Sequence, residues 1–302
     1  MKTTTILSKL VLPHPIIGAS GPFGYLHEWS NDMDLNQWAA LTLKTTTPLP
    51  RLGNETPRMA EVTSGMLNSI GLQNPGLIAV KEFELQELSN ITCPIIGNIG
   101  GNSIEDFLLM ASAYEEIEQI KLIEVNVSCP NVKNHGVNFA HDLEALKELA
   151  QALRPIIKKP LFIKLSPNLP SLVPTALALE KIGVDGLTIA NTYVGMKINL
   201  ESGKPILANR TGGLSGPAIK ALSLRHVYEV SQVCALPIIG LGGVESAEDV
   251  LEYIYAGATA VSIGAAILHD PQVLSTIISN LPYIMKKYNI EDLSKVRGIA
   301  WK

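Results

Sequence analysis

The sequence contains few cysteines and no long apolar run. Three cysteines occur in 302 residues, at positions 93, 129 and 234, and neither a Cys-x-x-Cys pair nor a His-x-x-x-His pair is present. This pattern disfavours a disulfide framework and a metal site, and it fits a reducing compartment. No apolar stretch approaches the roughly 20 residues of a membrane span, and the first residues are too interrupted for a signal peptide. We therefore expect a cytoplasmic chain that does not bind membranes.

Charged residues are also scarce, and positive charge is not concentrated anywhere. They make up 17% of the chain, and 24 Lys and Arg against 28 Asp and Glu give a net charge of -4. No basic run follows the pattern of a phosphate backbone, so the composition disfavours a nucleic-acid partner. No predicted strand is followed by Gly-x-Gly-x-x-Gly, which disfavours a tightly bound dinucleotide.

Apolar residues, by contrast, are abundant and arranged in short runs. They make up 46% of the sequence, enough for a sizeable core. Eight runs bounded by Gly, Pro or Asp predict buried strands, at 15–20, 39–45, 94–100, 122–128, 160–166, 186–192, 237–243 and 260–266. The gaps hold amphipathic segments such as 103–120, where Ser103 is the predicted N-cap of a helix. Such alternation predicts a parallel sheet covered on both faces.

The number of units predicts how this sheet is arranged. Eight strand and helix pairs favour an α/β fold closed into a (β/α)8 TIM barrel, with an open doubly wound sheet as the alternative. No stretch rich in Pro, Ser and charge divides the chain, so residues 1–302 are expected to form a single domain. The glycine-rich segment 193–216 is predicted to be an active-site loop inserted after the sixth strand.

The carboxyl ends of the strands build the active site in such a barrel, and here they carry distinctive residues. These are Ser20, Lys44, Thr45, Asn98, Asn126, Cys129, Lys164, Asn191, Thr192, Gly242, Gly243, Gly264 and Ala265. The glycines after the last two strands favour a phosphate site, because backbone N–H groups can approach an anion there. Tight turns alone would require the same residues. Gly212, Gly213 and Gly216 form a further segment of close approach.

Lysines and asparagines at these ends indicate the kind of ligand. Lys44 and Lys164 end apolar strands, where an unpaired ammonium is costly, so each is expected to face an anion or an electron-rich ring. The alternative is a lysine that snorkels to the rim. The asparagines at positions 68, 98, 126 and 191 offer paired donors and acceptors, which favours a planar heterocycle with alternating C=O and N–H groups.

The three cysteines divide into two kinds. Cys93 and Cys234 precede strands, at the opposite end of the barrel, and are predicted to be packed small hydrophobes. Cys129 follows a strand among polar groups, where a thiolate can act as a nucleophile or as a proton acceptor.

Longer motifs extend this interpretation over the whole chain. They are ASGPFG (19–24), LKTTTPLPRLGNETPR (43–58), NSIGLQNPG (68–76), NVSCPNVK (126–133), FIKLSPN (162–168), ILANRTGGLSGPAIK (206–220), PIIGLGG (237–243) and the terminal WK. In order and spacing the chain resembles the class 1 dihydroorotate dehydrogenases, and most closely the catalytic subunit of the NAD-linked class 1B. The resemblance implies a barrel that holds FMN and oxidises (S)-dihydroorotate to orotate in the biosynthesis of pyrimidines (UMP).

The resemblance also implies roles for individual residues. Cys129 resembles the base that removes the C5 proton while hydride leaves C6 for flavin N5, and Lys164 would lie near the N1/O2 edge of the flavin. The implied substrate residues are Lys44, Asn68, Ser69, Ile70, Gly71, Leu72, Asn126, Asn191 and Thr192. The implied FMN contacts are Ser20, Lys44, Thr45, Asn98, Asn126, Lys164, Ala190, Gly216, Gly242, Gly243, Gly264 and Ala265.

Electrons must leave this chain by another route, because it lacks an NAD fingerprint and clustered cysteines for an iron-sulfur site. The resemblance implies a partner subunit that carries FAD and a [2Fe-2S] cluster, in a heterotetramer built on a homodimer of barrels. The fumarate-dependent class 1A is the alternative, although it usually reads GLPN where this chain has GLQN (71–74). Membrane-associated class 2 enzymes use serine as the base, so Cys129 disfavours them.

Two further functions are possible alternatives, and one segment of the sequence departs from the family pattern. A flavin-free sugar-phosphate lyase or isomerase would use Lys164 as a Schiff base, and a scaffold subunit would bind FMN without turnover. After NVK the family commonly continues with Gly-Gly, whereas residues 134–141 read NHGVNFAH in the segment that resembles the lid over the base. His135 in this lid either tunes Cys129 or is a solvent-exposed loop residue.

Overall fold

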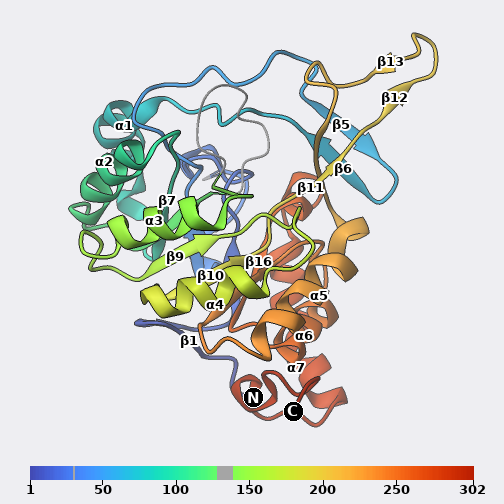
Figure 1. The fold of residues 1–302 in the computed structure, drawn as a ribbon. Helices are drawn as coiled ribbons and strands as arrows, with labels where there is room; N and C mark the ends of the chain where they lie inside the picture. Colours follow the sequence, from blue (N-terminus) through green and yellow to red (C-terminus); the bar gives the residue numbers. More distant parts are fainter. Residues whose placement is uncertain (30, 128–138) are drawn as a thin grey trace.

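Eight parallel strands form a closed barrel in the computed structural model, which describes residues 1–29, 31–127 and 139–302 (Figure 1). The barrel strands are β3 (Ile16–Gly18), β4 (Ala40–Thr42), β7 (Ile95–Ile99), β8 (Ile120–Asn126), β9 (Leu161–Lys164), β10 (Gly186–Ile189), β15 (Ile238–Leu241) and β16 (Ala260–Ile263). They follow one another in chain order, and β16 pairs with β3 to close the ring. Each predicted apolar run overlaps one barrel strand, and seven of the eight runs contain the whole strand, whereas β8 begins two residues before the predicted run 122–128, so the predicted fold class is confirmed.

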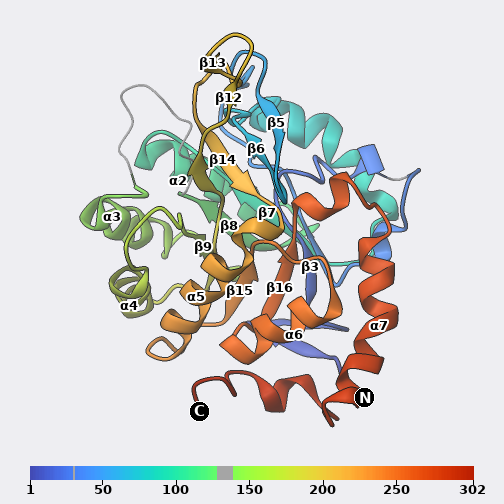
Figure 2. The same cartoon turned by 90° about the vertical axis from the view of Figure 1, so that its right-hand side faces the viewer.

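Helices surround the barrel and connect its strands (Figures 1 and 2). They are α1 (Gly76–Ala79), continued by the π-turn η3 (Val80–Glu84), α2 (Ile104–Glu115), α3 (Leu143–Leu153), α4 (Val173–Ile182), α5 (Lys220–Ser231), α6 (Ala247–Ala256) and α7 (Val273–Lys287). Ser103 caps α2 as predicted, because its hydroxyl accepts from the backbone N–H of Asp106 at 3.3 Å. Ser246 and Asp249 form a capping box at the start of α6.

The amino end of the barrel is filled by apolar side chains. A hairpin of β1 (Thr5–Leu7) and β2 (Leu10–Leu12) contributes Leu7 and Leu12 to a buried cluster with side chains from most of the barrel strands. The largest of these is Phe162, and a Cβ at Gly186 on the neighbouring strand would lie 2.2 Å from its ring. The small residue at position 186 therefore makes room for the large one, and the barrel has a packed floor rather than a pore.

A small antiparallel sheet lies at the other end. It consists of β5 (Met59–Val62), β6 (Gly65–Asn68), β14 (Gly212–Ser215) and β11 (Tyr193–Gly195), in the order β11-β14-β6-β5. A separate hairpin of β12 (Ile198–Asn199) and β13 (Lys204–Pro205) extends away from the body, at the opposite end from the two chain termini (Figures 1 and 2). The segment 193–216 is thus not the plain loop that was expected. It forms strands because β14 pairs with β6, which is distant in sequence.

Short 3-10 segments complete the described chain. These are η1 (His27–Trp29), η2 (Leu35–Gln37), η4 (Gln86–Asn90), η5 (Pro217–Ile219), η6 (Ala265–Leu268) and η7 (Leu293–Val296). Within residues 1–29, 31–127 and 139–302, no helix has both the length and the apolar character needed to span a bilayer. The same residues contain no group of three or more His, Cys, Asp or Glu side chains suited to a metal ion.

Candidate active site

A cavity of about 400 Å³ opens at the carboxyl ends of the barrel strands, with the antiparallel sheet contributing to its wall. Most of the predicted site residues line it. They are Ser20, Lys44, Thr45, Asn68, Ile70, Gly71, Leu72, Asn126, Lys164, Asn191, Thr192, Gly216, Gly242, Gly243, Gly264 and Ala265. Residues from at least six barrel strands or the turns after them therefore meet at one place. These positions are distant in sequence, and the structure places them together at the barrel mouth, as expected for residues at the carboxyl ends of barrel strands.

Three predicted residues of the described chain do not appear on this wall. The side chains of Ser69, Asn98 and Ala190 are fully buried behind it, so any contact with a ligand would involve their backbone or a small rearrangement. Cys129, the predicted base, lies outside the described residues, as does the part of the predicted lid that contains His135.

Two lysines give the cavity positive charge. Lys164 ends β9 and is only 4% exposed, yet its side chain makes no hydrogen bond or ion pair with any described residue. A buried, unpaired ammonium is costly, so this position is suited to a ligand that brings negative charge or electron density. Lys44 is partly buried, and burial lowers its pKa, while the Glu28 carboxylate opposes this shift and the Arg58 guanidinium adds to it.

The amide side chains around the cavity are held in defined orientations. Asn126 donates from Nδ2 to Thr45 Oγ1 at 2.9 Å, and Asn68 donates to the carbonyl of Gly213 at 3.4 Å. Asn191 accepts the backbone N–H of Thr192 at 2.8 Å through its own Oδ1. These bonds reduce the rotational freedom of the amides, so they present donors and acceptors to a planar ligand at low entropic cost.

The glycine turn after β15 suits an anion. Gly242 and Gly243 have positive φ values of 136° and 68°. A Cβ at Gly243 would lie 2.8 Å from Lys220 Cβ and 2.9 Å from the carbonyl oxygen of Gly216, so no larger residue fits there without displacing the turn. Lys220 itself is bound to Asp249 at 2.6 Å. Backbone N–H groups are therefore the natural partners for a phosphate at this turn.

Sequence reasoning missed a buried carboxylate and the apolar wall. Glu124 is 3% exposed inside the barrel, where it accepts from Asn98 Nδ2 and from Thr188 Oγ1, each at 2.6 Å. A single acidic residue within the apolar run LIEVN was the available signal. The apolar wall includes Met59, Met66, Ile219, Leu241, Val244 and Leu268, which a search for polar strand ends could not find.

The other two cysteines lie at the amino end of the barrel, as predicted. Cys93 precedes β7 and Cys234 precedes β15, and both belong to the apolar packing between barrel and helices. Burial raises the pKa of each thiol to about 11. At neutral pH both are therefore protonated and weakly reactive.

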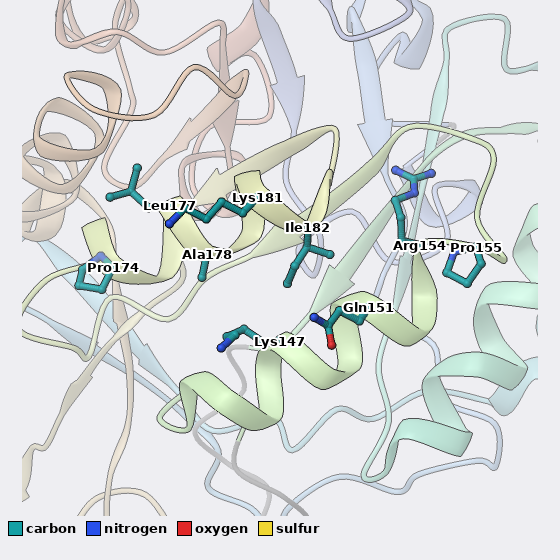
Figure 3. A pocket seen from close by; sticks show the side chains of 9 residues that line it. All are labelled: Lys147, Gln151, Arg154, Pro155, Pro174, Leu177, Ala178, Lys181 and Ile182. Carbon is teal, nitrogen blue, oxygen red and sulfur yellow. The ribbon is translucent and has the colours of Figure 1, made fainter.

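A larger hollow of about 810 Å³ lies outside the barrel, between α3 and α4 (Figure 3). Its wall combines apolar residues such as Leu177 and Ile182 with cationic ones. Two of these cations already have acidic partners, because Lys147 pairs with Glu144 at 2.7 Å and Arg154 with Asp185 at 2.6 Å. The wall of this outer hollow contains none of the strand-end residues, so the smaller cavity at the barrel mouth is the candidate active site.

Comparisons with known proteins find similarity along almost the whole chain. A family model described as dihydroorotate dehydrogenase matches residues 2–285. The catalytic subunit of dihydroorotate dehydrogenase B (NAD(+)) from Bacillus cytotoxicus is 47% identical over 296 residues, covering 98% of this chain and 96% of that protein. The same subunit from a Geobacillus species is also 47% identical over 296 residues, covering 98% and 95%.

A solved structure supports the architecture. The crystal structure of a dihydroorotate dehydrogenase from Eimeria tenella, in complex with ferulenol, superposes with a TM-score of 0.84. The match covers 99% of this chain and 88% of that one at 22% sequence identity, so it bears on the fold alone.

Proposed function

Since this chain belongs to the dihydroorotate dehydrogenase family, whose members are flavin-dependent, we propose that it oxidises (S)-dihydroorotate to orotate in pyrimidine biosynthesis. We propose further that it does so as the catalytic subunit of an NAD-linked enzyme. The observation that carries this proposal is the 47% identity to such catalytic subunits over 98% of the chain. The cavity at the barrel mouth, with Lys44, Lys164 and several amides on its wall, supports the same conclusion.

FMN is the proposed flavin, held by a single barrel domain that spans residues 1–302. The left-handed turn at Gly242 and Gly243 leaves room for a phosphate group against the backbone. Lys164, buried and without a partner among the described residues, suits the part of the flavin ring that gains electrons. When bound, FMN would supply a hydride acceptor. The residues present therefore fit this cofactor at both of its ends.

The remaining polar groups are proposed to bind and orient the substrate. Lys44 provides a cation for the anionic dihydroorotate, and the amides of Asn68, Asn126 and Asn191 are suited to its ring C=O and N–H groups. Cys129 is proposed as the base that takes the C5 proton, because a thiolate next to a positively charged site is a competent proton acceptor. The described residues hold the substrate in place, and the proton transfer depends on the segment that follows β8.

An electron-transfer subunit carrying FAD and a [2Fe-2S] cluster is the proposed partner. The relatives are named as catalytic subunits, which supports the existence of a second subunit. A homodimer of barrels is proposed as the core of the heterotetramer. The protruding hairpin supports contact with another chain, because it exposes apolar side chains that include Leu200 at 94%.

Replacement of Cys129 tests the chemistry. Cys129→Ala should leave the flavin bound and slow its anaerobic reduction by dihydroorotate by about 10²- to 10⁴-fold, because the general base is lost. Stopped-flow absorbance measures this rate, and Cys93→Ala is the matched control with a normal rate. A near-normal rate in Cys129→Ala would remove this cysteine from the mechanism.

The acceptor test separates NAD-linked from fumarate-dependent turnover. We expect the chain alone to be reduced by dihydroorotate but to transfer electrons to NAD only when the partner subunit is added. Turnover with fumarate by the chain alone, and none with NAD in the presence of the partner, would instead assign it to class 1A.

A further inference from the structure

Asn74 lies just outside the cavity wall and is almost fully buried, at 5% exposed. Its Nδ2 donates to the carbonyl of Leu72 at 2.7 Å and to Thr47 Oγ1 at 2.8 Å. Its Oδ1 accepts the backbone N–H of Gly76 at 2.9 Å and that of Thr47 at 3.2 Å. One carboxamide therefore connects the cavity segment 68–72 to the chain that follows β4.

The segment that Asn74 holds needs such support. Gly71 and Leu72 have φ values of 77° and 56°, and the left-handed region is unfavourable for a leucine. Both residues line the cavity. The bond from Asn74 fixes the Leu72 carbonyl, and the backbone N–H of Asn54 fixes the neighbouring carbonyl of Ile70 at 2.9 Å. The inward surface of this segment thus depends on hydrogen bonds made on its outward side.

Asn168 makes the same kind of connection at a second cavity segment. It lies in the loop after β9 and does not line the cavity. Its Oδ1 accepts the backbone N–H of Val194 at 2.9 Å, and its Nδ2 donates to the carbonyl of Thr192 at 3.1 Å. The same Nδ2 donates to Ser166 Oγ at 3.2 Å. Asn168 therefore binds the backbone on both sides of Tyr193 and fixes the segment that presents Thr192.

The two asparagines share one chemical feature. A carboxamide has a donor and an acceptor at fixed spacing, so it can pair with a backbone N–H and a backbone C=O as a neighbouring strand would. We propose that Asn74 and Asn168 are positioning residues of the substrate site, which hold 68–72 and 192–194 in the conformations that bind the substrate. The proposal rests on the proposed function, because it concerns the affinity of the same cavity for dihydroorotate and orotate.

Aspartate substitutions provide a nearly isosteric test. Asn74→Asp keeps the acceptor for Gly76 but loses the donor to the Leu72 carbonyl and places a negatively charged oxygen against it. Asn168→Asp keeps the acceptor for Val194 and does the same to the Thr192 carbonyl. Asn36→Asp is the matched control, since Asn36 accepts from the backbone N–H of Thr92 at 2.7 Å and donates to the Asn90 carbonyl at 3.2 Å at the amino end of the barrel.

The Kd for orotate is measured from its perturbation of the flavin spectrum, together with KM, kcat and bound FMN. Both cavity-side variants should raise Kd and KM about 10-fold or more, which is the order expected when a hydrogen bond is replaced by a repulsive contact. The fall in kcat should be smaller, FMN content should be normal, and Asn36→Asp should bind orotate like the wild type. The effects of the two variants should multiply when combined, because they act on separate segments.

Several outcomes would decide against the proposal. Wild-type affinity for orotate in a folded Asn168→Asp variant would overturn it for that residue, even if Asn74→Asp fails to fold. An equal loss of affinity in Asn36→Asp would reduce both effects to general destabilisation. A wild-type protein that contains FMN but does not bind orotate would overturn the proposed function instead, so the two failures can be distinguished.

Discussion

A lysine lies close to each end of strand β9, and the two lysines differ in their burial and in their hydrogen-bond partners. Lys159, near the amino end, donates from Nζ to the carbonyls of Tyr114 at 2.9 Å and Ile117 at 2.7 Å. Lys164, at the carboxyl end, is more deeply buried and has no partner among the described residues. Lys159 thus supports the packing of α2, whereas the Lys164 ammonium faces the cavity in which we propose that the flavin binds.

The same contrast holds for the barrel as a whole. Its amino end contains Leu7, Leu12 and Phe162 in close apolar contact. Its carboxyl end contains two lysines, several amides and a glycine turn around a cavity. A barrel tolerates uncompensated polar groups at one end because the rest of the core provides its stability. Substitutions at the two ends should therefore separate activity from stability.

The largest effect is expected for Lys164→Met. Loss of a positive charge that stabilises electron density in a dry site typically costs about 10²- to 10³-fold in rate, so reduction of the flavin by dihydroorotate should slow by that factor. The free energy of unfolding of the FMN-free protein should equal or exceed that of the wild type, because a buried, unpaired cation has been removed. Stopped-flow absorbance and urea denaturation measure the two quantities. A large loss of stability with a normal rate of flavin reduction would show that Lys164 has a structural role and not a functional one.

Lys159→Met should show the opposite pattern. It leaves two carbonyls without their charged donor, and we expect about 2 kcal/mol of lost stability, within the range for hydrogen bonds to charged groups. The rate of flavin reduction at a temperature where the variant is folded should be that of the wild type. If the rate fell as in Lys164→Met, the functional contrast between the two ends would be lost.

A pair of glycines tests the phosphate turn with a smaller effect. Gly243→Ala combines a left-handed φ of 68° with a Cβ only 2.8 Å from Lys220 Cβ, so we expect FMN to bind about 10-fold more weakly. Gly183→Ala is the control, because φ there is 88° but no atom lies within 4 Å of the added Cβ. It should lose stability and keep its affinity for FMN. Equilibrium dialysis of FMN distinguishes them, and equal affinities would argue against a phosphate at the turn.

The smallest effect concerns pH and Lys44. Burial lowers the pKa of this lysine below its ordinary 10.5. Its ammonium favours anionic orotate, so orotate affinity should fall as pH rises through the lowered pKa. The FMN-free protein should change in the other direction, because a lysine whose folded pKa is depressed contributes more stability as pH rises towards 10.5. Lys44→Gln should abolish both dependences. An affinity for orotate that stays constant up to pH 10.5 would contradict the lowered pKa of Lys44.

Sequence patterns predicted the barrel well because its signals are local. Each strand is a short apolar run, and the residue that ends it faces the mouth by the rule of the fold. The same patterns failed for β11 and β14. β11 pairs with β14, and β14 pairs with β6, which joins segments about 145 residues apart, as in the Asn68 to Gly213 contact. The resemblance implied ligand contacts for Ser69 and Asn98, whose side chains the structure places behind the wall, since a linear pattern does not specify which way a side chain points.

The asparagines show most clearly which site residues a sequence pattern can and cannot predict. Four were predicted to form the ligand site, and three of them line the cavity. Asn74 and Asn168 occur within the quoted motifs NSIGLQNPG and FIKLSPN, yet no role was predicted for either. Their importance depends on hydrogen bonds to neighbouring backbone, which become visible only once the chain is folded.

We propose that the carboxyl end of this barrel binds FMN and dihydroorotate together. The most direct test of this proposal is an anaerobic titration of the purified, FMN-reconstituted chain with dihydroorotate, followed by visible absorption. We expect a yellow protein whose flavin absorption is bleached by dihydroorotate, with one flavin per chain. A protein that cannot be reconstituted with FMN, or a bound flavin that dihydroorotate leaves oxidised, would contradict the proposal.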